Sequence, residues 1–152
     1  MTHPQIVTEQ SPAEKSRLWL RYLQQQGYRI TGSRRAVVDA LAQAERSLTA
    51  ADLYEIGRAK HKGLGLVSVY RTLEKLEELG LVQRVHGPGG CHAYISAQDG
   101  HNHMLVCENC GRVEMFEGDD LKDFTRNLEK QSGFRIHEHW LQFFGVCTQC
   151  QV

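Results

Sequence analysis

The 152-residue chain contains none of the segments that mark a membrane-spanning or exported protein. No apolar run is long enough to cross a bilayer, and the N-terminus has no basic, apolar and small-residue export signal. It also lacks the H-E-x-x-H sequence of many zinc hydrolases. These absences predict a cytoplasmic protein with no membrane partner. They argue against an enzyme, with a zinc-dependent hydrolase or nuclease as the alternative from another class.

The chain also has no net charge, because 18 Lys and Arg balance 18 Asp and Glu, but the charges are unevenly distributed. Residues 1–90 carry 13 basic and 9 acidic residues. Residues 91–152 carry 5 basic and 9 acidic residues, together with five of the eight histidines. A basic half suits a polyanion, whereas an acidic half rich in histidine suits cations. The two halves are therefore expected to differ in function.

Four of the five cysteines form two C-x-x-C pairs, Cys107 with Cys110 and Cys147 with Cys150. Such pairs are typical of zinc ligands in a reducing compartment, where disulfide frameworks are rare. Four thiolates complete a closed tetrahedral site, which predicts a structural Zn²⁺ that joins distant segments. The alternatives are four unrelated thiols, or a redox switch in which oxidation of these cysteines releases zinc.

Two His-x-His pairs, His101 with His103 and His137 with His139, suggest a second metal site. Alternating positions of a β-strand share one face, so each pair is expected to lie on one face of its strand. If the two strands are neighbours, up to four imidazoles converge beside the cysteines. A histidine-rich site binds metal reversibly and with pH dependence, as a sensor requires. The strands are predicted over 101–106 and 135–144.

The N-terminal half predicts a winged helix-turn-helix, because helices are followed by a hairpin with a Gly/Pro turn. Four helices are predicted, over 14–26, after Thr31, after the Thr49–Asp52 capping box, and over 68–79. In the third of these helices, Leu53, Tyr54 and Ile56 are expected to face inward. The two hairpin strands are predicted at 81–85 and 91–95. Strands at 101–106, 112–116 and 135–144 with a helix at 119–132 predict a small α/β domain. The fold class is α+β, with a flexible N-terminus at 1–13, a DNA-binding domain at 14–95, a hinge at 96–100 and a metal-binding domain at 101–152.

The last predicted helix of the N-terminal half would enter the major groove of double-stranded DNA with its first residues. Arginine forks onto guanine or phosphate, and tyrosine packs on a thymine methyl or bonds a phosphate. Arginines near the second helix would add phosphate or minor-groove contacts. The alternative is an ordinary solvated surface, with Tyr70 partly in the core. The candidate DNA-binding residues are Ser68, Tyr70, Arg71, Arg29, Arg34 and Arg35.

Over residues 15–150 the chain resembles the ferric uptake regulator family of bacterial metal-sensing repressors. The motifs that carry the resemblance are Arg29-Ile30-Thr31 with Arg34, Thr49 to Tyr54, Val69-Tyr70-Arg71-Thr72-Leu73, Gly80-Leu81-Val82, the histidine-rich run before Cys107-x-x-Cys110-Gly111, and Cys147-x-x-Cys150. The order and spacing of these motifs, taken together, are specific.

The resemblance implies a homodimer formed through the C-terminal domains. Metal in the sensory site would set the angle between the domains, so that two winged helices meet a palindromic operator. Such repressors usually control metal-uptake genes, and no small-molecule substrate other than metal ions is implied. An imidazole-rich site favours zinc, with iron second. An iron-responsive or peroxide-responsive regulator of the same family is the alternative.

The sensory ligands depart from the family pattern. His101, His103 and His139 occupy one ligand set, but its acidic ligand falls near Lys122. His137, Asp119, Asp120 or Asp123 are candidate replacements. Cys91 and His92 are expected to lie by the hinge, where they could form an unusual inter-domain site with His86. The other interpretation of Cys91 is a small buried residue on a wing strand.

Overall fold

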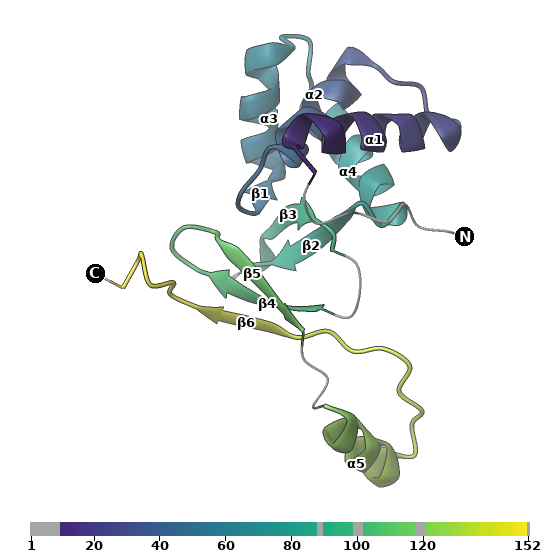
Figure 1. Ribbon diagram of the computed structural model, residues 1–152, viewed down its shortest axis with the longest axis vertical. Coiled ribbons are helices and arrows are strands. Elements are labelled where there is room, and N and C mark those ends of the chain that lie inside the picture. Colours follow the sequence, from purple (N-terminus) through teal and green to yellow (C-terminus); the bar gives the residue numbers. More distant parts are fainter. Residues whose placement is uncertain (1–9, 88–89, 99–101, 118–120, 152) are drawn as a thin grey trace. The chain divides into compact units, whose positions relative to one another are not determined.

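The computed structural model describes residues 10–87, 90–98, 102–117 and 121–151 (Figure 1). The chain divides into two compact units, residues 1–98 and 99–152.

The first two helices of unit 1 begin at residues whose side chains cap them. Helix α1 (Pro12–Gln25) begins two residues before the prediction, because Ser11 and Glu14 form a capping box. The Ser11 hydroxyl accepts the Glu14 N–H, and the Glu14 carboxylate accepts the Ser11 N–H at 3.0 Å. Helix α2 (Gly32–Ala42) follows Thr31 as predicted, with the Thr31 hydroxyl accepting the Arg34 N–H at 3.1 Å.

The next two helices form the helix-turn-helix. The predicted capping box at Thr49 and Asp52 is confirmed at the start of α3 (Ala50–Lys60). Leu53 is buried, but Ile56 is 41% exposed, so its predicted inward orientation is wrong. The buried side runs through Gly57 instead, where an added Cβ would lie 2.4 Å from Leu64. Helix α4 (Leu66–Glu78) begins two residues before the predicted helix.

A three-stranded antiparallel sheet completes the winged helix, with strand order β1-β3-β2. Strands β2 (Val82–His86) and β3 (His92–Ser96) form the predicted hairpin, and β1 (Leu48–Thr49) pairs with β3. Apolar side chains from all four helices and the sheet share one core, which includes Trp19, Leu23, Val37, Leu41, Leu53, Val69, Leu73, Leu76, Leu81 and Tyr94. Unit 1 therefore has its own hydrophobic core.

Unit 2 contains a second three-stranded sheet, with order β5-β4-β6. Its elements are β4 (Asn102–Cys107), β5 (Val113–Glu117), α5 (Lys122–Ser132) and β6 (Gln142–Gly145). The expectation that the two histidine-bearing segments are neighbours is confirmed by the parallel pairing of β4 with β6. The predicted strand over 135–144 is wrong in extent. Gln142 pairs with Met104, the third residue of β4, so at most two residues before Gln142 could still pair with that strand.

Unit 2 buries few apolar side chains. Among its described residues, only Val106 and Cys107 are buried apolar side chains, and α5 has no buried residue. Large apolar side chains are exposed instead: Leu105, Phe124, Leu128, Phe134, Trp140, Phe143, Phe144 and Val146. Among the described residues, none of the helices combines the length and the apolar composition that a bilayer span requires.

Candidate metal centres and nucleic-acid interface

The four C-x-x-C cysteines meet at one end of the second sheet. Cys107 ends β4, and its turn is closed by the Gly111 N–H, which donates to the Cys107 carbonyl at 3.0 Å. A matching turn follows β6, where the Cys150 N–H donates to the Cys147 carbonyl at 2.9 Å. Because β4 and β6 run parallel, both turns lie at the same sheet end. The four sulfurs all lie within 4.8 Å of one another.

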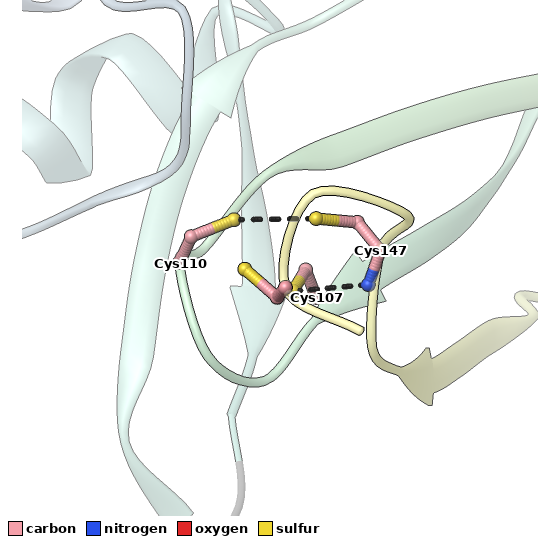
Figure 2. Close-up of side chains that lie close together, drawn as sticks. Cys107, Cys110 and Cys147 are labelled. Carbon is pink, nitrogen blue, oxygen red and sulfur yellow. Dashed lines mark hydrogen bonds between the residues drawn. The ribbon is translucent and has the colours of Figure 1, made fainter. Parts of the chain in front are cut away.

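The sulfur spacing fits a tetrahedral metal ion. Figure 2 shows the side chains of Cys107, Cys110 and Cys147 converging, with the sulfurs of Cys110 and Cys147 3.8 Å apart. Zinc–sulfur bonds of about 2.3 Å at tetrahedral angles place two sulfurs about 3.8 Å apart. A disulfide would need about 2.05 Å. The geometry and the four soft ligands fit Zn²⁺, so these cysteines can hold a structural zinc ion.

Backbone donors prepare one of these cysteines for metal binding. The N–H of Cys147 points at the Cys107 sulfur from 3.3 Å, and together with the Cys110 N–H it lowers the pKa of Cys107 to about 6. Cys150 shows the opposite effect, because its thiol donates to the sulfurs of Cys147 and Cys110. These bonds raise the pKa of Cys150 to about 12. One ligand is thus held as a thiolate at neutral pH, and another loses its proton when metal binds.

Two of the four predicted sensory histidines meet in the structure. His103 on β4 is 1% exposed, and its ring centre lies 5.3 Å from that of His139. His139 lies outside the strands, contrary to the prediction, yet the chain entering β6 brings it to His103. His137 is exposed and also lies outside the strands. His101 falls outside the described residues. Of the four imidazoles that were expected to converge, those of His103 and His139 lie together in the described part of the chain.

The candidate acidic ligands and the hinge group are placed differently from the predictions. Asp119 and Asp120 lie outside the described residues, and Asp123 is an exposed partner of Arg126, 3.4 Å away. Cys91 is exposed, so its interpretation as a buried residue is wrong. Its neighbour His92 pairs with His86 at the loop end of the hairpin, whereas Ser96 pairs with Val82 at the other end. The proximity of Cys91 and His92 to the hinge is therefore also wrong.

The first turns of α4 present the candidate base-reading residues. Tyr70 is 55% exposed, so its alternative placement in the core is wrong. Arg71 is exposed and Ser68 is half-buried. Sequence reasoning missed Leu66 and Val67, which are 45% and 64% exposed at the very start of this helix. The sequence shows that both residues are apolar, but it does not show that they are exposed while Val69, Leu73 and Leu76 of the same helix are buried.

The three arginines near α2 differ in their surroundings. Arg29 and Arg35 are exposed, as a phosphate contact requires. Arg34 is half-buried, donates to the Arg29 carbonyl, and lies over the Tyr28 ring with its guanidinium carbon 5.7 Å from the ring centre. These contacts hold Arg34 against the protein surface. Arg29 and Arg35 are the more accessible pair.

A winged helix and a four-thiolate site in one chain define a two-domain protein that binds both DNA and metal. The chain also matches the model of the ferric uptake regulator family over residues 25–144. It is 36% identical to the ferric uptake regulation protein of Bacillus subtilis, over 86% of this chain and 90% of that protein.

Solved structures show the same fold. The ferric uptake regulator of Vibrio cholerae aligns with a TM-score of 0.65 at 26% identity, over 84% of this chain and 98% of that one. A zinc uptake regulator complexed with zinc and DNA aligns with a TM-score of 0.71 at 22% identity, over 93% and 96%. The chain belongs to the ferric uptake regulator family. It is a metal-responsive, DNA-binding transcriptional regulator and not an enzyme.

Proposed function

We propose that this regulator is a zinc-responsive repressor of zinc-uptake genes, which binds a palindromic operator in the cytoplasm as a homodimer when its sensory site is loaded. In this proposal, residues 14–95 bind DNA, residues 96–100 form the hinge, and residues 101–152 bind metal and dimerise. The structural zinc is held by the four cysteines. The sensory metal is held around His103 and His139.

The observation that carries the proposal is the pairing of the buried His103 with the half-buried His139. Metal–nitrogen bonds of about 2.0–2.1 Å at tetrahedral angles place two imidazole centres about 5 Å apart. The separation of 5.3 Å between His103 and His139 supports a shared ion. Imidazole donors suit zinc, and they also accept iron, nickel and cobalt. Zinc is therefore the first metal to test and iron the second.

The position of His103 suggests how metal would affect the dimerisation unit. His103 and Cys107 lie four residues apart on β4 and thus on the same face of one strand. His139 precedes β6, the strand that leads to Cys147 and Cys150. Holding His139 against His103 therefore orders the segment that enters β6. A metal that favours the DNA-binding conformation raises the affinity of the protein for DNA. Bound DNA must then raise the affinity of the protein for that metal by the same factor.

The proposed dimer is supported by the apolar surface of unit 2. Eight large apolar side chains, from Leu105 to Val146, are exposed there, whereas the described part of the unit buries little apolar area. A surface of this kind is typical of a protein–protein interface. A second copy of the chain would bring two α4 helices to the two half-sites of a palindrome.

The test is operator binding by the full-length protein at buffered concentrations of free Zn²⁺, and of Fe²⁺ under anaerobic conditions. We expect zinc to tighten DNA binding with the four-cysteine zinc already in place. His139→Ala should abolish this response and keep the structural zinc, while the adjacent exposed variant Glu138→Ala should respond normally. A response to Fe²⁺ alone would replace zinc with iron as the sensed metal. DNA binding indifferent to both metals, or an unchanged response in His139→Ala, would refute the proposed sensory site.

A further inference from the structure

The loop end of the wing hairpin brings two histidines together. His86 and His92 are paired residues at the last described rung of the β2–β3 ladder, and both are exposed. Beyond them the Gly87 N–H donates to the Cys91 carbonyl at 2.7 Å, which holds the two strand ends together. The register thus fixes the two imidazoles on the same face of the hairpin.

The two rings have a separation that a shared metal ion requires. Their centres are 5.0 Å apart and their planes are 79° apart. Two imidazoles on one tetrahedral ion have centres about 5 Å apart, from metal–nitrogen bonds of about 2.0–2.1 Å. The pair is therefore arranged for bidentate binding with little movement of the backbone. Edge-to-face packing of two neutral rings is the ordinary structural alternative.

We infer that His86 and His92 form a third metal site on the wing, specific for a divalent transition-metal ion such as Zn²⁺, Ni²⁺ or Cu²⁺. Imidazole ligands favour these borderline cations over Mg²⁺ and Ca²⁺, which prefer oxygen. Two protein ligands leave the remaining positions to water, so binding is weaker than at the four cysteines. This site lies in unit 1 and does not depend on the proposed sensory site.

Cys91 stands outside the pair although it is the next residue in the chain. Over the described ranges, the four C-x-x-C cysteines are the one group of three or more His, Cys, Asp or Glu side chains whose ligand atoms meet within 4.8 Å. A three-ligand site of His86, Cys91 and His92 is therefore not assembled in this structure. The inferred site consists of the two imidazoles.

The test uses the full-length zinc-loaded protein, with Cu²⁺ or Ni²⁺ added as a paramagnetic probe and residue-resolved NMR as the readout. Substoichiometric metal should broaden the wing signals, including those of Arg84 and Tyr94, and His86→Gln or His92→Gln should each reduce the apparent affinity at the wing at least tenfold. His61→Gln, His139→Ala and Cys91→Ser should leave the wing broadening intact. Unchanged amide signals from α1 to α4 show that each variant is folded.

Three results would overturn the inference. Equal broadening of the wing signals in the wild type and in both glutamine variants would show that His86 and His92 do not bind the metal and only pack against each other. Loss of broadening in Cys91→Ser would assign the metal to the thiol instead of the imidazole pair. Loss in His139→Ala would mean that the probe acts from the sensory site. A failed zinc response in operator binding would not affect the inference, because the readout is local to the wing.

Discussion

Replacing Cys147 with serine should unfold the second unit while leaving the first unit intact. The described part of unit 2 buries only Val106 and Cys107 as apolar side chains, and a fully buried valine contributes about 1.5–3 kcal/mol. Ordering the backbone costs about 1–2 kcal/mol per residue. We therefore expect the unit to depend for stability on a metal ion held by the four cysteines and on a partner chain. Unit 1 has its own core and does not share this dependence.

The size of the effect follows from the number of ligands. A structural zinc site contributes about 10–16 kcal/mol, so one thiolate of four accounts for about 2.5–4 kcal/mol. Cys147→Ser should thus weaken zinc binding roughly 100- to 1,000-fold. It also removes the sulfur that lies 3.8 Å from that of Cys110. The expected products are a chain without retained zinc and a disordered unit 2.

The assay combines zinc content after gel filtration with residue-resolved NMR of the full-length chain. We expect signals from 102–117 and 142–151 to collapse, while signals from the four helices of unit 1 persist. Cys91→Ser is the matched control, because Cys91 is exposed and lies in the other unit. Retention of one zinc per chain in Cys147→Ser, or collapse of both units together, would refute the reasoning.

Three further predictions concern DNA, acid and dimerisation. Arg71→Ala should weaken operator binding by about 1–3 kcal/mol, measured by fluorescence anisotropy, with zinc content unchanged; normal binding would remove Arg71 from the reading surface. Because backbone N–H groups of Cys147 and Cys110 lower the pKa of Cys107 to about 6, its thiolate persists at neutral pH and is protonated as the pH falls through that value. Because protons compete with zinc for the thiolates, the structural zinc should be retained at neutral pH and lost as the pH falls, and a release midpoint above neutrality, followed with a metal indicator, would contradict this. Phe143→Ala should raise the dimer dissociation constant roughly 30-fold if it costs about 2 kcal/mol at the interface. Leu18→Ala, at an exposed position in unit 1, is the control in analytical ultracentrifugation, and equal dissociation constants for the two variants would remove Phe143 from the interface.

The elements that local chemistry controls can be predicted from the amino-acid sequence. Caps at Thr31 and Thr49 begin helices because their hydroxyls accept the orphan N–H groups of the first turn. The glycine-rich turn separates two strands, and each C-x-x-C pair can supply two corners of a tetrahedral metal site, so two such pairs predict one shared ion. These local rules were sufficient to predict the winged helix and the cysteine cluster.

Which of the chemically similar side chains meet depends on strand pairing and on the path of the chain between strands. Alternation over 135–144 suggested a long strand, but a strand also needs a partner, and the parallel register with β4 provides one only from Gln142 onward. The register likewise places His92, which the sequence puts on the return strand of the hairpin, directly opposite His86. His139 approaches His103, while His137 stays exposed two residues away. Residue type and spacing specify what a side chain can bind, whereas strand register and chain path determine which side chains share an ion.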